Sequence, residues 1–339
     1  MINSSNLINK NEQRFRSLAL LTVIVIYLLI LAGGIVRGTG SGMGCPDWPK
    51  CFGRWIPPTE ASQLPLNYQE IYGAKLKGEV EFNAVKTWIE YVNRLLGVLS
   101  GFFVLATVVA SISYLKKDKA VFLGSFAAFL LIGLNGWLGS RVVATELAQY
   151  MITLHLLLAV LVVFSLIFVL IRSYSFQLES ASGQLKTARI NGLLLTALFI
   201  SLSQVLLGTQ VRDALDEVVK RLGQSQRNSW IDNIDWRFYI HRSYSLVVLF
   251  VQVVISYRLY KLGVKGLINT LAKMIVAVTI AEIITGAVMA YFGVPAIAQP
   301  IHLLLAVVMI GLQFAVWVIQ QPKLMGSNQA LEESRLLNV

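Results

Sequence analysis

Charged residues are scarce in this chain. Only 14% of its 339 residues are Asp, Glu, Lys or Arg, whereas 56% are apolar. This composition lies far from that of an average soluble domain. The sequence also has no evident nucleotide-binding loop, nucleophile motif or soluble catalytic domain. Histidine occurs three times and cysteine twice, so few residues are candidates for metal or redox chemistry.

Apolar runs of about 20 residues recur along the chain, and each is long enough to cross a ~30 Å hydrocarbon layer as a helix. The runs lack the alternation of apolar and polar residues that marks barrel strands. Open-edged backbone cannot face lipid, so the pattern predicts an all-α membrane protein. We expect eight spans, at residues 17–36, 88–114, 120–140, 151–171, 190–211, 238–257, 272–292 and 301–320.

Lys and Arg predict the orientation of the spans, because they concentrate in cytoplasmic segments. One set of segments is rich in them: Lys10, Arg14, Arg16, Lys116, Lys117, Lys119, Arg172, Lys186, Arg189, Arg258, Lys261, Lys265, Lys273, Lys323 and Arg335. All these residues fall on one side of the predicted membrane. We therefore expect both termini in the cytoplasm and a bacterial inner membrane as the location. The net charge of +11 then reflects topology, and it does not indicate nucleic-acid binding.

The two halves of the chain repeat each other. "EYVNR" at 90–94 corresponds to "FYIHR" at 238–242, and "LHLLLAV" at 154–160 corresponds to "IHLLLAV" at 301–307. Composition alone makes leucine-rich helices resemble one another, but it does not explain matched polar residues. The repeat predicts two four-helix bundles related by a pseudo-two-fold axis along the membrane normal. Their expected bounds are 17–172 for the N-terminal bundle with an outer loop at 38–86, 173–188 for a cytoplasmic linker, and 189–322 for the C-terminal bundle.

Both cysteines, Cys45 and Cys51, fall in the outer loop, within "CPDWPKC". This loop faces an oxidising compartment, so the pair can close a small ring. Two unrelated free thiols are the alternative. A redox or metal pair is disfavoured because the spacing is not C-x-x-C and no histidine is near.

The three histidines, His155, His241 and His302, each lie in the first turns of an even-numbered span, hence at one membrane depth. Asn93 takes the corresponding place in the remaining even span. Two imidazoles facing each other suit axial ligation of heme iron, whereas zinc requires three or four ligands. We expect a bis-histidine heme at His241 and His302, and a heme held by His155 alone in the other half. Neutral, hydrogen-bonded histidines are the alternative.

Five arginines are candidate partners for heme propionates, because guanidinium binds carboxylates well. Arg94 and Arg242 directly follow the ligand positions, and Arg37, Arg141 and Arg212 lie at the outer ends of odd-numbered spans. The alternative interpretation is that each of these arginines simply extends its side chain to the membrane–water interface.

Two acids lie within spans. Glu90 shares a helix face with Asn93, one turn nearer the outside. Beside a heme edge its carboxyl group can move protons or hold a reactive intermediate; an interfacial acid paired with an arginine is the alternative. Glu282 lies near the middle of the seventh span, and the sequence assigns it no role.

"VRGTGSGMGCPDWPKC", together with "EYVNR", "LHLLLA", "YIHR" and "IHLLLA", resembles the heme A synthase family from Ala32 to about Trp317. The resemblance implies two four-helix bundles and conversion of heme O to heme A by successive hydroxylation of a ring methyl to a formyl group. It also implies partnership with a heme O synthase and with cytochrome oxidase assembly, and a quinone or other electron acceptor.

The resemblance assigns roles to individual residues as well. It implies heme b bound by His241 and His302, substrate heme O held at His155, and an essential acid at Glu90. It also implies a disulfide in the outer loop, since the cysteines match a pair that is bridged in some family members.

Asn93 departs from the family pattern, because it stands where the E-x-x-H motif has its histidine. Asparagine is a poor iron ligand, although its amide forms hydrogen bonds. An active variant with a more open iron and a paralogue without the chemistry are both compatible with this change. The rival functions are a heme b electron-transfer cytochrome and a transporter without heme.

Overall fold

The computed structural model describes residues 10–73, 81–178, 190–261 and 266–326. Eight helices within these ranges are long and apolar enough to cross a membrane, and the described residues form no strand. The predicted all-α membrane fold is therefore confirmed. The eight helices are α1 (Lys10–Gly38), α3 (Ala84–Ser111), α4 (Lys119–Ala144), α5 (Gln149–Ser173), α7 (Asn191–Leu222), α8 (Trp236–Lys261), α9 (Leu267–Tyr291) and α10 (Ala298–Gln320).

Shorter helical segments lie between or after the long helices. They are η1 (Ala61–Gln63), α2 (Tyr68–Tyr72), η3 (Ile112–Tyr114), η4 (Gln224–Ser229), η5 (Ile231–Asn233) and α11 (Pro322–Met325). Residues 179–188 of the predicted cytoplasmic linker lie outside the described residues.

The predicted spans all coincide with long helices, but α7 continues well beyond residue 211 to Leu222. This extension is charged, and Arg237 at the start of α8 binds it through ion pairs with Asp213 and Glu217. A third acid, Asp235, lies 2.9 Å from the Arg237 guanidinium. The extension also buries Ala214, Leu215 and Val218 against Trp230 and Ile234, so polar contacts on one face and apolar burial on the other both prolong the helix.

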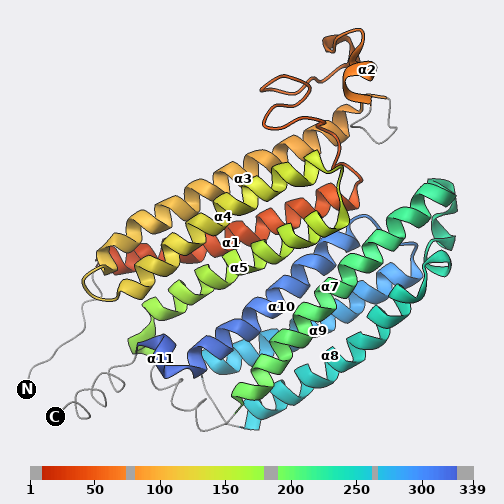
Figure 1. Cartoon of the computed structure of the whole chain (residues 1–339). Coiled ribbons are helices and arrows are strands. Elements are labelled where there is room, and N and C mark those ends of the chain that lie inside the picture. The colour runs from red at the N-terminus through yellow and green to blue at the C-terminus, as the bar shows by residue number, and fades with distance from the viewer. Residues whose placement is uncertain (1–9, 74–80, 179–189, 262–265, 327–339) are drawn as a thin grey trace, which may run out of the picture.

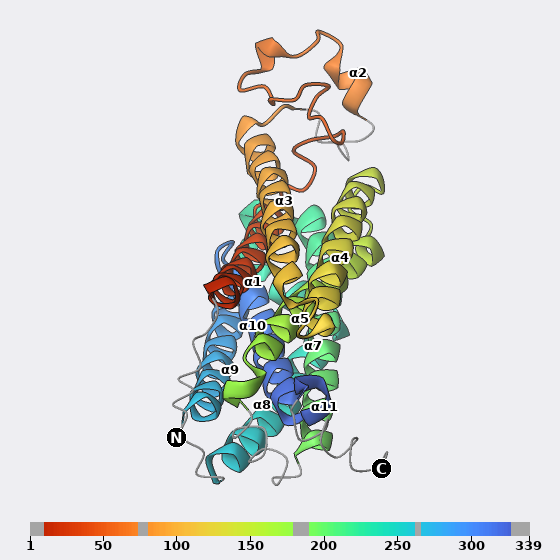
Figure 2. The same cartoon turned by 90° about the vertical axis from the view of Figure 1, so that its left-hand side faces the viewer.

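The helices of each half contact one another in a closed ring. α1 packs on α3 and α5, and α4 packs on the same two helices; α7, α8, α9 and α10 contact one another in the same cyclic way. Figure 1 shows the two groups side by side, with the loop that carries α2 projecting beyond one end. Figure 2 shows the same projection after a quarter turn. These contacts are those expected within each half, while the pseudo-two-fold relation between the halves stays a prediction.

The halves meet along α1, α5, α7 and α10, whose buried side chains form the largest apolar cluster. Leu166 on α5 and Ile310 on α10 are both fully buried there. Gly34 on α1 permits a close approach, because a Cβ at this position would lie 2.9 Å from the Cβ of Pro300 on α10. A residue larger than glycine at this crossing would push the two helices apart.

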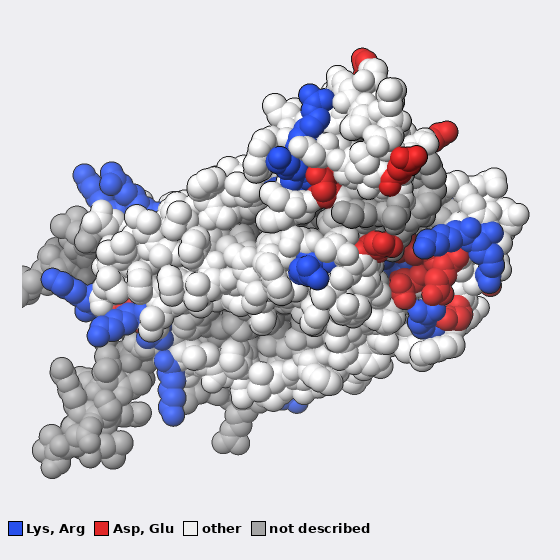
Figure 3. Space-filling view, turned by 45° about the horizontal axis from the view of Figure 1, so that its top comes forward, with Lys and Arg blue, Asp and Glu red and all other residues white. Residues whose placement is uncertain are grey.

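The start of α1, the end of α5 and α11 lie at one end of the molecule. The Arg16 guanidinium donates a hydrogen bond to the carbonyl of Ser173, and Arg172 donates one to the carbonyl of Leu324. A chain that crosses the membrane an even number of times begins and ends on the same side, so the start of α1 and the segment that follows α10 are expected at one end. On the face in Figure 3, acidic residues gather at the opposite end, and the flank between the ends carries little charge.

The outer loop has a small core of its own. Cys45 and Cys51 form a disulfide and are fully buried, and Phe52 and Leu64 pack beside them. Of the two interpretations of the cysteines, a small disulfide-closed ring or two free thiols, the ring is confirmed. Gly44 is required next to it, because a Cβ there would lie 2.5 Å from the Lys86 carbonyl oxygen in the first turn of α3. The disulfide-bonded segment therefore lies directly against α3.

Candidate functional site

His241 on α8 and His302 on α10 face each other. Their ring centroids are 6.5 Å apart and the ring planes are inclined at 77°. A metal bonded to one nitrogen of each ring at about 2.0 Å separates the ring centres by about 6 Å. The spacing therefore fits two imidazoles on opposite sides of one iron. The described residues contain no group of three or more His, Cys, Asp or Glu side chains that could hold a bare metal ion.

Each ligand position lies against a glycine of a neighbouring helix. A Cβ at Gly208 on α7 would lie 3.3 Å from Cε1 of His241, and one at Gly286 on α9 would lie 3.5 Å from Cε1 of His302. Gly139 on α4 stands in the same relation to His155, at 3.4 Å. The imidazoles thus pack directly on helix backbone, which fixes the position of each ring.

Asn93 repeats this arrangement without an imidazole. A Cβ at Gly33 on α1 would lie 4.0 Å from its Oδ1. The sequence did not predict that these glycines lie against the three histidines and Asn93. The available signal was spacing, because Gly33 and Gly208 each precede an arginine, Arg37 or Arg212, by four residues.

The Nδ1 atoms of the histidines have different surroundings. His302 Nδ1 lies 2.9 Å from Oε2 of Glu282 and 2.9 Å from Oγ1 of Thr285. His241 Nδ1 lies beside the backbone of Gln204, and His155 Nδ1 lies beside the backbone of Asn135, without a hydrogen bond of good geometry. Among the described residues, therefore, only His302 has a side-chain partner for its Nδ1 atom.

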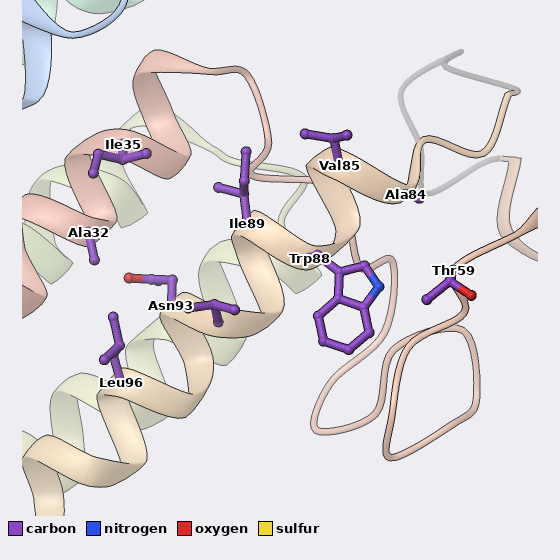
Figure 4. A pocket seen from close by; sticks show the side chains of 10 residues that line it. Ala32, Ile35, Thr59, Ala84, Val85, Trp88, Ile89, Asn93 and Leu96 are labelled. Carbon is purple, nitrogen blue, oxygen red and sulfur yellow. The ribbon is translucent and has the colours of Figure 1, made fainter.

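A cavity of about 610 Å³ opens between α1 and α3 and reaches Asn93. Its wall is almost entirely apolar, with Ala32 and Ile35 from α1 and Ile89 and Leu96 from α3. Figure 4 shows the Asn93 side chain directed from α3 toward α1 within this lining. The buried Asn93 Oδ1 accepts no hydrogen bond from the part of the chain that the structure describes. Asn93 is therefore a polar side chain in an apolar lining whose oxygen has no partner among the described residues.

Glu90 and Arg94 fasten the disulfide-bonded segment to α3. The Glu90 side chain is only 4% exposed, and its Oε2 accepts a hydrogen bond of 2.8 Å from the Cys45 amide. Its Oε1 accepts one of 2.5 Å from Arg94. The Arg94 guanidinium also donates to the carbonyls of Cys45, Asp47 and Lys50. Both side chains predicted to serve the substrate half therefore also position the outer loop.

Two of the predicted propionate contacts are brought together at the junction of the halves. Arg37 on α1 forms an ion pair with Asp216 on α7, and Arg212 pairs with the same carboxylate at 2.9 Å. Arg212 also donates to the Gln299 side chain at 2.8 Å and to the Arg37 carbonyl at 3.0 Å. These arginines therefore bind protein groups and join α1, α7 and α10.

The other two arginines lie apart from this junction. Arg242 is exposed and lies over the rings of Phe238 and Tyr239, with its guanidinium carbon 5.7 and 5.3 Å from their centroids. Arg141, in the last turn of α4, is also exposed. Both are accessible to an anionic group, and their role as propionate contacts stays a prediction.

Comparison with known proteins places these features in a family context. The sequence pattern of the cytochrome oxidase assembly protein family COX15-CtaA matches residues 16–314. The heme A synthase of Rickettsia africae is 25% identical over 329 residues, which cover 86% of this chain and 94% of that protein.

Two further heme A synthases align over shorter stretches. That of Shewanella oneidensis is 23% identical over 214 residues, covering 63% of this chain and 62% of that protein. That of Bartonella bacilliformis is 29% identical over 168 residues, covering 45% of this chain and 47% of that protein. The chain thus spans less than two thirds of the length of these two relatives.

Replacing Arg94 with alanine should release the disulfide-bonded segment from α3. A hydrogen bond to a charged group contributes about 1.5–3 kcal/mol, so we expect proteolysis within residues 38–86 to become at least about tenfold faster. The measurement is limited proteolysis of the purified protein in detergent. Arg242→Ala is the matched control. Arg242 is the counterpart of Arg94 in the second repeat, but its guanidinium lies over the rings of Phe238 and Tyr239. Equal cleavage of the two variants would show that the loop is held by other contacts.

Proposed function

The chain belongs to the COX15-CtaA family of cytochrome oxidase assembly proteins, and from this membership we propose that it is a heme A synthase, which converts heme O into heme A. The proposed reaction is successive hydroxylation of a ring methyl group until it becomes a formyl group. The observation that carries the proposal is the spacing of His241 and His302, whose ring centroids lie 6.5 Å apart.

The half formed by α7 to α10 is proposed to hold a resident heme b through His241 and His302. A heme with two axial histidines supplies a one-electron carrier when bound. The protein's part is to fix both rings, which Gly208 and Gly286 do by admitting them against α7 and α9. Arg242 is proposed to contact a propionate, since its guanidinium is exposed one residue after His241.

The half formed by α1, α3, α4 and α5 is proposed to receive heme O as substrate. His155 is its one imidazole, and the Asn93 amide across the bundle can donate a hydrogen bond to a water molecule. The apolar cavity beside Asn93 supports this placement, because it offers a water-poor surface to a largely apolar substrate. Arg94 and Arg141 are the proposed cationic contacts of this half.

Glu90 is proposed to be the catalytic acid of the reaction. Its carboxyl group lies one turn from Asn93 on α3, where it can accept a proton released near the substrate. The amide of Cys45 and the guanidinium of Arg94 hold its two oxygens. This places the carboxyl group under the outer loop, which limits its access to bulk water.

The protein crosses the membrane several times, and we propose a bacterial inner membrane with both termini in the cytoplasm. The lysine- and arginine-rich segments on one side support this orientation. Proposed partners are the lipid bilayer, a heme O synthase, the cytochrome oxidase assembly machinery and a quinone or other electron acceptor. The positive net charge is accounted for by topology, and no nucleic-acid partner is proposed.

Asn93 favours one second candidate function. With no imidazole opposite His155, the protein could be a heme b electron-transfer cytochrome, or a paralogue without synthase activity. The intact Glu90, Arg94 and His155 support the synthase over this alternative. A transporter without heme is separated from both by the absence of a Soret band in the purified protein.

Co-expression with a heme O synthase tests the proposed activity. We expect heme A or its alcohol precursor in extracted pigments, and we expect Glu90→Gln to lower its yield at least about a hundredfold, as for loss of a general acid or base. Glu146→Gln, an exposed acid in the turn after α4, is the control. The Soret absorbance of each variant reports whether it has assembled. Unchanged pigments with the native chain would favour the electron-transfer cytochrome.

Carbon monoxide binding tests the role of Asn93. With heme O loaded, we expect the reduced native protein to bind CO, because His155 leaves one face of the iron without a strong ligand. Asn93→His should reduce CO affinity at least about tenfold, because a second imidazole next to Gly33 would compete with CO for the face that His155 leaves open. CO difference spectra provide the measurement, and Asn93→Ala, which leaves the face open, is the matched control. Equal CO binding by Asn93→His and the native protein would refute this role.

A further inference from the structure

Glu282 has no role in the proposed reaction, yet it lies inside the membrane-spanning part of α9. Its side chain is 14% exposed, and one oxygen, Oε1, is buried without a hydrogen-bond partner among the described residues. Acidic residues within spans are costly and usually serve a function. The other oxygen, Oε2, lies 2.9 Å from Nδ1 of His302. The acid is therefore directed at one of the proposed axial ligands.

The contacts at Nδ1 of His302 favour a hydrogen on that nitrogen. The Thr285 hydroxyl donates to the Ala281 carbonyl at 2.9 Å and lies 2.9 Å from His302 Nδ1. Its single hydrogen is therefore used, and Oγ1 acts as an acceptor toward the ring. With acceptors at both Oγ1 and Glu282 Oε2, Nδ1–H is the donor. The lone pair of the ring then resides on Nε2, the nitrogen available to a metal.

The residue behind the ring differs at each of the four corresponding sites, those of His302, His241, His155 and Asn93. Glu282 lies four residues before Gly286, the glycine that faces His302. The equivalent residues before the other three glycines are Gln204, Asn135 and Leu29. At His241 and His155 the ring nitrogen lies beside the backbone of Gln204 and Asn135, and Leu29 precedes the glycine that faces Asn93. Within the part of the chain that the structure describes, a carboxyl group contacts a ring nitrogen only at His302, so its effect is specific to that site.

We propose that Glu282 is a positioning residue that holds the Nδ1–H tautomer of His302 and thereby tunes the resident heme. This inference rests on the proposed function, which places a bis-histidine heme between His241 and His302. A carboxyl acceptor on Nδ1–H makes the ligating nitrogen more basic, and a more basic ligand stabilises ferric over ferrous iron. The result is a lower reduction potential than the same pair of histidines would give without Glu282.

Potentiometric titration of the heme-loaded full chain tests this proposal. We expect Glu282→Gln to shift the ferric–ferrous equilibrium about tenfold toward ferrous iron, because the second ligand shell changes metal binding by about 10- to 100-fold. For one electron, tenfold corresponds to a potential higher by about 59 mV. Glu282→Leu, which removes both charge and acceptor, should shift it further in the same direction. Electron paramagnetic resonance of the ferric state should report weaker donation from the altered histidine.

Two controls separate this role from a structural one. Asn135→Leu alters the equivalent position beside His155 and should leave the potential of the resident heme unchanged. Thr285→Val removes the other acceptor and should raise the potential by less than Glu282→Gln. An unchanged potential in Glu282→Gln, with the Soret band of the native protein, would overturn the proposal. A native protein without any bis-histidine heme would instead contradict the proposed function itself.

Discussion

Two imidazoles held 6.5 Å apart between apolar helices are the arrangement on which the account of this protein depends. A polar ring inside a membrane span is costly unless its nitrogens find partners, and lipid supplies none. At His302 the partner of one nitrogen is Glu282, and at both histidines a glycine admits the ring against a helix backbone. The distance of 6.5 Å between the two ring centroids fits one metal ion bonded to both rings. The surrounding helices thus fix the position of both imidazole rings and the tautomer of His302. The two imidazoles provide the affinity for iron.

The two halves share this frame but differ in what they add to it. The C-terminal half has two histidines and an acid behind one of them. The N-terminal half has one histidine, Asn93 with an unpartnered amide oxygen, an apolar cavity and the Glu90–Arg94 pair under the disulfide-bonded loop. An electron carrier needs a rigid, saturated iron, whereas a substrate must enter, react and leave. The division of these features between the halves is consistent with electron transfer in one and chemistry in the other.

The sequence allowed the eight spans to be predicted because lipid imposes a single requirement, a long apolar helix, which is visible in any window of about 20 residues. The ring in the outer loop was one of two open readings. The continuation of α7 to Leu222 was missed because Arg237 and the buried Trp230 and Ile234, which follow the helix in sequence, pack against it. The pairing of Arg37 with Asp216 was missed because contacts between halves leave no periodic signal, whereas Arg212 and Asp216, four residues apart on α7, had a signal in the spacing. The partner of Glu282 depends on the rotation of α9 about its axis relative to α10, which local sequence does not determine.

Absorption spectra of single-histidine variants test the central claim most directly. His241→Ala and His302→Ala should each lose the low-spin bis-histidine spectrum of the resident heme, whereas His155→Ala should retain it, because its imidazole belongs to the other half. All three proteins are purified in the same detergent, and heme is quantified per chain. Retention of the bis-histidine spectrum in His241→Ala or His302→Ala, or its loss in His155→Ala alone, would contradict the assignment of the resident heme to His241 and His302.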